Sequence, residues 1–283
     1  MRVILFSKMF KDKSPDELTA LAAESGVEGF DLCVRPGYPV NPENAAQALS
    51  EMVRTMQRAG LAIPMVTGNF DLLSPDHPTA EPILAAMDKA DVRLIKLGYF
   101  AFDPIKQDYW KEVDRIRRLF EGWQALGRRY GVRICYHTHS VRCMGLNCAA
   151  LAHLIHGFDP QYIGAYIDPG HMAIEGEEFR TGLAMVRSQL SIVALKDVSL
   201  TRKPKNDHGS CVAEFVPGGE GLVDWTTVLD ELVRIGYDGP LSVHCEFQVA
   251  PEAFMETMRR DVRFFKAQLA AAQSPARRAS NAK

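Results

Sequence analysis

The chain has 283 residues, of which 47% are hydrophobic and 24% are charged. This composition is typical of a folded globular protein and excludes disorder of the whole chain. The formal net charge is -2, so the basic excess that marks nucleic-acid binding is missing, and we expect no nucleic-acid partner. No stretch reaches the roughly 18 unbroken apolar residues of a membrane span, and we expect no membrane partner.

The cysteine usage indicates a reducing compartment. The 6 cysteines include no Cys-x-x-Cys pair, and in a chain of this length they do not follow the pattern of a disulfide framework. The N-terminal stretch has a short apolar run without the cleavage-site pattern of a signal peptide, and it leads directly into a strand and a helix. We therefore expect a cytoplasmic protein.

Short β-branched runs alternate with longer amphipathic stretches along the whole chain. Each run predicts a strand, and each predicted strand is followed by a helical pattern. The expected strands are Val3–Ser7, Gly29–Val34, Ala62–Thr67, Leu94–Tyr99, Arg133–His139, Gly164–Asp168, Ile192–Asp197 and Leu241–Phe247.

Several helix ends are marked by local chemistry. Ser14 before Pro15 and Asn41 before Pro42 each put a capping side chain ahead of a proline at the first helical position. Asp224 puts a capping side chain ahead of a later helix that begins at Trp225. Glycines close the helical runs just before a strand, where a left-handed backbone is needed. These glycines are Gly26, Gly60, Gly131, Gly157 and Gly236.

The repeated order of helix, glycine and strand predicts parallel strands joined by crossover helices. Eight such units in about 270 residues favour one closed (β/α)8 TIM barrel, of class α/β. A doubly wound open sheet is the alternative, but it usually carries a glycine-rich turn after its first strand, and here that turn reads Ser7-Lys8-Met9-Phe10. We expect the barrel to span residues 1–271 and a flexible C-terminal tail to span 272–283.

Reactive groups of such a barrel lie at the carboxyl ends of its strands. Side chains alternate along a strand, so His137 shares a face with His139, and His244 shares a face with Glu246. If these faces point inward, nitrogen and carboxylate ligands converge in a way that suits a divalent ion such as Zn, Mn, Co or Mg. The converging residues would be His137, Asp168, Lys196 and either His244 or Glu246.

Structural roles remain open for some of these residues. Asp168 precedes Pro-Gly and can act as a turn cap. Lys196 and Asp197 can form a structural ion pair. Burial of the charged Glu246 side chain in an apolar strand would cost free energy, and this cost favours a functional role for the residue.

Five sequence motifs carry a resemblance to a known protein family. The chain resembles the xylose isomerase-like TIM barrel superfamily, the sugar phosphate isomerase/epimerase family that also includes endonuclease IV-type enzymes. The motifs are YHTHS at 136–140, IDPGH at 167–171, ALKDV at 194–198, VPGGEGLVDW at 216–225 and GYDGPLSVHCEF at 236–247.

In typical members of that superfamily, strands five to eight end in Glu, Asp, His and Glu, and these four residues hold a metal. Asp168 matches the Asp, and His171 matches a neighbouring substrate or metal contact. The other three positions depart from the pattern, because they hold His137, Ala194 and His244. Glu246 follows His244 by two positions and would share its inward face of the strand.

The resemblance therefore leaves two possibilities for the metal. His137, Asp168, His171 and either His244 or Glu246 can hold it, since imidazole can replace carboxylate on Zn or Mn. Alternatively the site has lost its metal, and Lys196 supplies the positive charge.

The function implied is proton transfer at the carbon next to a carbonyl in a sugar, keto-sugar or polyol. We expect Glu246 or His137 to be the base, and a metal or Lys196 to hold the oxyanion. Isomerase or epimerase activity is the leading interpretation. A metal-free dehydratase or lyase and a non-catalytic carbohydrate-binding barrel are the alternatives. Phosphodiester hydrolysis is disfavoured because it needs several metals and a basic groove.

Substrate contacts are expected from residues at or after strand ends, and many relatives pair their barrels, which implies a homo-oligomer as an option. The loop from 201 to 219, with Arg202, Lys203, Lys205 and His208, is long enough to be a lid. The expected substrate-binding residues are His139, His171, Lys96, Tyr99 and Arg142.

Overall fold

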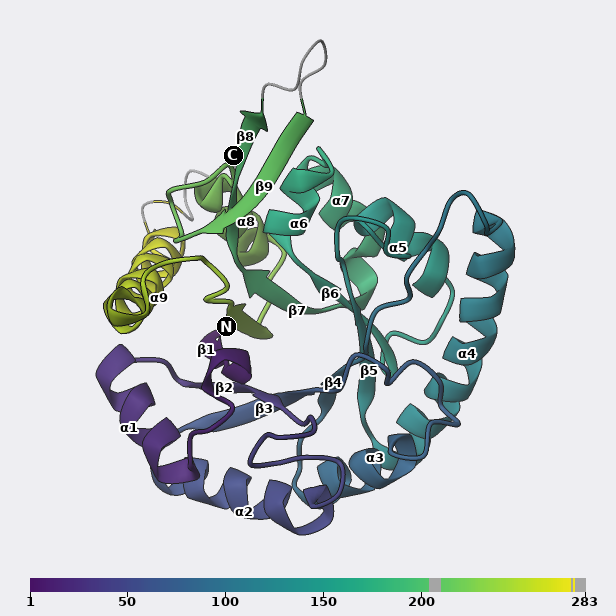
Figure 1. The fold of residues 1–283 in the computed structure, drawn as a ribbon, viewed down its shortest axis with the longest axis horizontal. Helices are drawn as coiled ribbons and strands as arrows, with labels where there is room; N and C mark the ends of the chain where they lie inside the picture. The colour runs from purple at the N-terminus through teal and green to yellow at the C-terminus, as the bar shows by residue number, and fades with distance from the viewer. Residues whose placement is uncertain (204–209, 276, 278–283) are drawn as a thin grey trace.

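The structure is a computed structural model that describes residues 1–203, 210–275 and 277. Parallel strands close into a barrel in the order β1-β10-β7-β6-β5-β4-β3-β2 (Figure 1). This confirms the predicted single (β/α)8 barrel and excludes the open sheet. The barrel strands are β1 Arg2–Phe6, β2 Gly29–Cys33, β3 Ala62–Thr67, β4 Leu94–Lys96, β5 Arg133–His137, β6 Ile163–Ile167, β7 Leu190–Leu195 and β10 Pro240–Val243.

Helices surround the barrel and cover its outer face (Figure 1). Short 3-10 turns, η1 (Ser7–Phe10), η2 (Arg187–Gln189) and η3 (Pro251–Ala253), join some of the elements. The α-helices are α1 Pro15–Ser25, α2 Ala45–Arg58, α3 Ala80–Lys89, α4 Tyr109–Tyr130, α5 Cys148–Ile155, α6 Pro169–Ile174, α7 Phe179–Val186, α8 Trp225–Arg234 and α9 Phe254–Ala272.

The apolar core has two parts. The larger part fills the layer between strands and helices, as expected for a barrel whose helices bury one stripe against the sheet. The smaller part packs inside the barrel and consists of Ile4, Met65, Cys135, Tyr166, Ile192 and Ala194. The inside of the barrel is thus filled.

The predicted helix ends are confirmed except for one. Ser14 caps α1, with Ser14 Oγ accepting from Glu17 N at 3.3 Å and Glu17 Oε2 accepting from Ser14 N at 2.8 Å. All five predicted glycines have φ between 62° and 87°. The predicted start at Pro42 is wrong, because α2 begins at Ala45. Asn41 and Asn44 accept hydrogen bonds from each other's backbone N–H, at 3.1 and 2.8 Å, and so form a separate turn before the helix.

Most strands end earlier than predicted. β4 stops at Lys96, β5 at His137 and β10 at Val243, so Tyr99, His139 and Glu246 lie in the loops beyond the ladder. Several polar side chains therefore follow the strands, while Lys96 and His137 are the last residues of β4 and β5.

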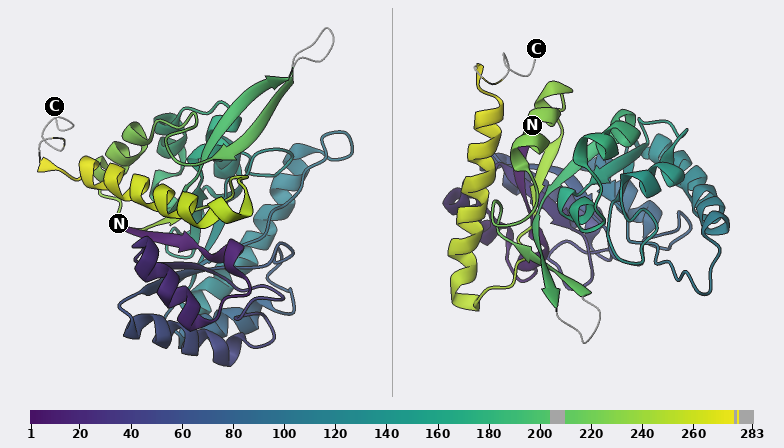
Figure 2. Two further views of the ribbon diagram at one scale, coloured as in Figure 1. Left: turned by 60° about the vertical axis from the view of Figure 1, so that its left-hand side comes forward. Right: turned by 90° about the horizontal axis from the view of Figure 1, so that it is seen from above.

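An antiparallel hairpin follows β7 and corrects the predicted lid. β8 (Asp197–Lys203) pairs with β9 (Ser210–Val216) over their whole length, from Asp197 opposite Val216 to Lys203 opposite Ser210. The expectation of a loop is wrong for these residues, whose β-branched members, such as Thr201 opposite Val212, suit a strand. Figure 2 shows the hairpin projecting from the barrel. Lys205 and His208 lie outside the described residues.

The C-terminal boundary stays a prediction. α9 extends to Ala272, and beyond it Arg277 Nε donates to Asp230 Oδ2 at 3.0 Å. Residues 276 and 278–283 of the expected tail lie outside the described part of the chain. Among the described helices, none is long and apolar enough to cross a membrane.

Candidate active site

A cavity opens at the carboxyl ends of the strands, the face where this fold carries its reactive groups. Its wall comes from sequence segments that are far apart, because the closed barrel brings all its strand ends together. The charged residues of the lining are four cations and one carboxylate. They are Lys8, Arg35, Lys96, Lys196 and Glu246.

Three buried side chains next to this cavity form a group that suits a metal ion. Ligand atoms of His137, Asp168 and His244 all lie within 4.8 Å of one another. His137 Nε2 is 3.7 Å from Asp168 Oδ2, and within the described residues neither atom has a hydrogen-bond partner. Because unpaired buried polar atoms cost free energy, two imidazoles and a carboxylate aimed together fit a divalent cation.

Neighbouring groups orient each member of this group. Tyr99 OH lies 3.2 Å from His137 Nδ1, which leaves His137 Nε2 free. Burial, and then the charge of Lys96, hold the pKa of His137 well below its ordinary value, so the imidazole is neutral, as a metal ligand must be. Tyr166 OH lies 2.7 Å from His244 Nε2.

Asp168 has the capping role that the sequence allowed. Its Oδ1 accepts from His171 N at 3.1 Å and caps α6, with Pro169 at the first helical position. Its Oδ2 takes no part in the cap and lies beside His137. Asp168 is therefore a helix cap that keeps one oxygen available.

Lys196 is the central cation of the site. Its buried Nζ lies 2.8 Å from Glu246 Oε2, 3.0 Å from His171 Nε2 and 3.4 Å from Asp168 Oδ2. The ring of Phe215 on β9 lies 4.2 Å from the same Nζ, so the hairpin covers this lysine. Burial lowers the pKa of Lys196, but the charges of Asp168 and Glu246 outweigh burial and raise the pKa above its ordinary value.

Glu246 is held by two lysines. Lys196 pairs with its Oε2 and Lys8 with its Oε1. Burial raises the pKa of Glu246, but the charge of Lys196, a hydrogen bond with His244 and the charge of Lys8 prevail and hold the pKa far below its ordinary value. The side chain is 17% exposed, so an ionised carboxylate faces the cavity.

The alternative of a Lys196–Asp197 ion pair is wrong. Asp197 Oδ2 accepts from Gly219 N at 2.9 Å and from Trp225 Nε1 at 3.0 Å, and Oδ1 accepts from Val223 N at 3.2 Å. Asp197 thus fixes the loop before α8, while Lys196 turns to the cavity.

Two of the predicted metal ligands lie beside the three-residue group. His171 Nε2 is 3.8 Å from Asp168 Oδ2 but 3.0 Å from Lys196 Nζ, and its Nδ1 is 2.8 Å from Ser140 Oγ. Both carboxylate oxygens of Glu246 are paired with lysines, Oε1 with Lys8 and Oε2 with Lys196. Both residues therefore surround Lys196 more closely than they approach His137.

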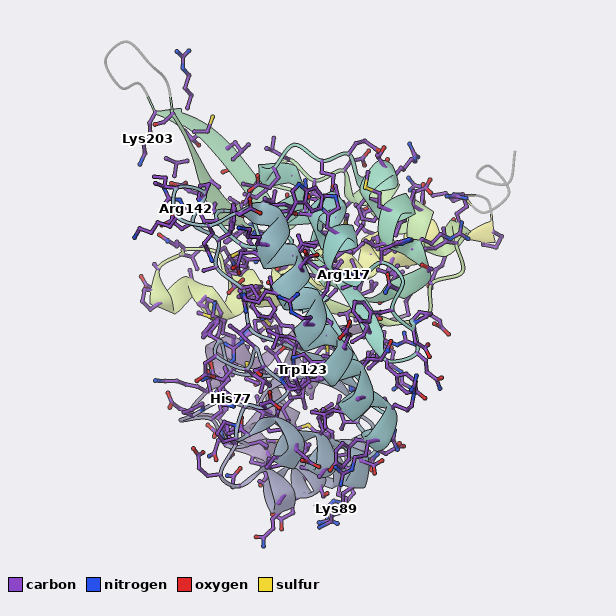
Figure 3. The ribbon with its side chains drawn as sticks, turned by 90° about the vertical axis from the view of Figure 1, so that its right-hand side faces the viewer. His77, Lys89, Arg117, Trp123, Arg142 and Lys203 are labelled. Atoms are coloured by element: carbon purple, nitrogen blue, oxygen red, sulfur yellow. The ribbon has the colours of Figure 1, made fainter. Side chains whose placement is uncertain are left out.

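The predicted substrate contacts divide between the cavity and the surface. Lys96, Tyr99 and His139 line the cavity. His171 lies behind Lys196. Arg142 is exposed and lies at the periphery of the molecule (Figure 3), outside the cavity lining.

Three polar residues of the first two strand units were missed by sequence reasoning. Lys8 and Arg35 line the cavity, and Asp31 is fully buried in β2, where it accepts from Thr67 Oγ1 at 2.6 Å. Reactive groups of this fold lie at the carboxyl ends of all eight strands. A search of every strand end would have found the acid within β2 and the cations just after β1 and β2.

A closed parallel barrel with ionisable side chains at its strand ends defines the class of this protein. The chain belongs to the family described as the xylose isomerase-like TIM barrel, whose model matches residues 19–268. It is similar to the inosose dehydratase of Bacillus licheniformis, with 27% identity over 175 residues, which are 56% of this chain and 57% of that protein. The chain thus matches little more than half the length of this curated relative.

Solved structures share the fold. The 3-keto-D-glucoside 4-epimerase of E. coli superposes with a TM-score of 0.73 at 16% identity, over 94% of this chain and 99% of that one. A xylose isomerase-like TIM barrel protein from Mycobacterium smegmatis, in complex with magnesium, gives a TM-score of 0.68 at 17% identity, over 96% and 98% of the two chains.

Proposed function

We propose that this protein catalyses proton transfer at the carbon next to a carbonyl group in a keto-sugar or related polyol. The observation that carries the proposal is the pair of Glu246 and Lys196, 2.8 Å apart in one cavity. A carboxylate beside a buried ammonium offers both a base for the proton and a fixed charge for the oxyanion that then develops. The names of the relatives, a 3-keto-D-glucoside 4-epimerase and an inosose dehydratase, support the same first step.

In this mechanism Glu246 takes the proton from the carbon, and the electron pair of that C–H bond moves to the carbonyl oxygen. Lys196 stabilises the enolate oxygen, and Lys8 keeps the Glu246 side chain in place. A second acid then returns a proton to the enolate. Return to the opposite face of the same carbon gives epimerisation, and return to the neighbouring carbon gives isomerisation. Departure of a β-hydroxyl as water gives dehydration.

His137, Asp168 and His244 would hold a divalent metal, with His137 Nε2 and Asp168 Oδ2 among its ligand atoms. A bound metal would polarise the substrate carbonyl and lower the pKa of an adjacent hydroxyl. The magnesium complex of a protein with the same fold supports this part of the proposal. His171 Nε2 and Lys196 Nζ lie 3.0 Å apart, beside the position that a metal would take.

Dehydration is a second candidate outcome, and one specific observation favours it. The curated relative with matching sequence is a dehydratase, whereas the epimerase shares only the fold at 16% identity. Residue similarity reports on a site more directly than fold does.

The experiment is incubation of the purified protein with keto-sugars and keto-inositols in deuterium oxide, followed by NMR. Deuterium at the carbon next to the carbonyl would support proton transfer whatever the product is. An epimer, an isomer or an unsaturated ketone then identifies the outcome. If no compound gains deuterium or changes, the proposal fails.

A further inference from the structure

Two buried cations in the cavity lack an acidic partner among the residues that the structure describes. Arg35 is 5% exposed and Lys96 is 3% exposed, and both belong to the cavity lining. Lys8 and Lys196 share the carboxylate of Glu246. Among the described residues, neither Arg35 nor Lys96 forms an ion pair.

Arg35 is anchored through its Nε, and its two terminal nitrogens remain available to bind a ligand. Its Nε donates to Gly68 O at 2.9 Å, and its guanidinium carbon lies 4.3 Å from the centre of the Phe70 ring and 5.9 Å from that of Phe6. These contacts fix the plane of the guanidinium. In the part of the chain that the structure describes, its two terminal nitrogens have no acceptor.

Lys96 is held in a similar way from β4. Its Nζ lies 3.9 Å from the centre of the Tyr99 ring. No hydrogen-bond acceptor for this ammonium occurs among residues 1–203, 210–275 and 277. An aromatic face attracts a cation but does not neutralise it, so the ammonium of Lys96 has no ion-pair partner among the described residues.

The nearby acid Asp31 is already occupied. It accepts from Thr67 Oγ1 at 2.6 Å, from Ser242 Oγ at 3.1 Å and from Tyr166 OH at 3.3 Å. The cavity therefore holds four cations against the single carboxylate of Glu246. Buried charge without a partner costs free energy, and a ligand that supplies negative charge would remove that cost.

We propose that Arg35 and Lys96 form a carboxylate-binding subsite, and that the substrate is a hydroxylated keto acid, such as a keto-sugar acid, instead of a neutral sugar. The planar fork of a guanidinium matches a planar carboxylate with two parallel hydrogen bonds. The ammonium of Lys96 would place a second positive charge beside the oxygens of the bound carboxylate. The identity of the substrate rests on the proposed function, whereas the binding of a carboxylate does not.

The test is thermal denaturation and calorimetry with glycolate, pyruvate and D-gluconate as carboxylate probes. Ethylene glycol and D-glucitol serve as neutral probes, and inorganic phosphate serves as the competing anion. We expect the carboxylates to bind roughly tenfold more tightly than the neutral probes, the range of a charge-assisted hydrogen bond. Arg35→Gln and Lys96→Met should each remove that difference.

Matched controls keep the result specific. Arg118→Gln on α4 and Lys89→Met on α3 remove the same charges from exposed positions, and Figure 3 shows Lys89 at the outer end of α3. Both control variants should bind the carboxylates as the parent protein does. Equal binding of neutral probes, carboxylate binding that survives in both cavity variants, absence of carboxylate binding, or a preference for phosphate would overturn the subsite.

Failure of the subsite and failure of the proposed function give different results. If no keto compound gains deuterium but carboxylates bind through Arg35 and Lys96, the subsite stands and the reaction is wrong. If neutral keto-sugars gain deuterium as fast as keto acids and both cavity variants leave that exchange unchanged, the reaction stands and the subsite is wrong.

Discussion

Lys196 Nζ lies 3.4 Å from Asp168 Oδ2, the carboxylate oxygen that also faces His137. A lysine therefore contacts one of the three groups that would hold a metal. Its ammonium and a divalent ion are both positive, so they compete for the same oxygen. The histidine expected from the family at strand seven is replaced by the buried Ala194, and Lys196, directly after β7, brings a positive charge to the site.

This competition predicts that Lys196→Met binds divalent metal more tightly than the parent protein. Removal of the ammonium leaves Asp168 Oδ2 without a positive neighbour and removes a repulsion from the metal position. We expect a gain of about tenfold in affinity for Mn or Zn, corresponding to roughly 1.4 kcal/mol. Calorimetric titration of both proteins measures it.

The control for the metal titration is Asp168→Asn, which removes the charge of the ligand and should abolish binding. Equal metal affinity in the parent protein and in Lys196→Met would show that the lysine does not compete. Metal binding that persists in Asp168→Asn would show that the three-residue group is not the site.

The pKa of Lys96 predicts a pH-dependent stability. Burial, and then the charge of Arg35, lower this pKa to about 7, against the opposite effects of Asp31, Cys33 and Glu246. The unfolded chain holds this proton up to a pH of about 10.4. Between these values the unfolded state binds more protons than the folded state, so this group makes stability rise with pH.

Lys96→Met should therefore raise the melting temperature most at about pH 6 and below, where the buried ammonium is mostly charged, and the advantage should shrink as the pH rises from about 7 to about 10. Melting curves of the variant and of Lys89→Met, across that range, test this. A constant difference at all pH values would contradict the account.

Asp197 has a structural role that mutation can separate from the chemistry. It accepts hydrogen bonds from Gly219 N, Val223 N and Trp225 Nε1, and it is buried. Asp197→Ala would leave these donors unpaired and should cost about 3 kcal/mol or more of unfolding free energy. Urea denaturation, with the exposed Asp238→Asn as control, measures it, and a loss no larger than that of the control would refute the role.

The barrel was predictable from the sequence because local signals repeat in every unit. Helix caps such as Ser14 and left-handed glycines such as Gly131 act within a few residues, and the alternation of strand and helix needs no long-range information. The hairpin of β8 and β9 was missed because charged residues such as Arg202 and Lys203 hide its strand pattern.

Contacts in the site depend on barrel closure, and single residues do not reveal them. Lys8 reaches Glu246 across 238 positions of the chain. Arg35 resembles a surface residue in the sequence, yet the rings of Phe6 and Phe70 enclose it. His137, Asp168 and Lys196 were identified because their strand ends carry several ionisable residues in succession.

Solvent deuterium exchange in the Glu246→Gln protein tests the central claim most directly. The amide keeps the shape of the side chain but cannot take a proton, so exchange at the carbon next to the carbonyl should fall at least about 100-fold. Glu252→Gln, at an exposed position on η3, should exchange as the parent protein does. Exchange by Glu246→Gln at the parent rate, in a protein with an unchanged melting curve, would contradict the assignment of Glu246 as the base.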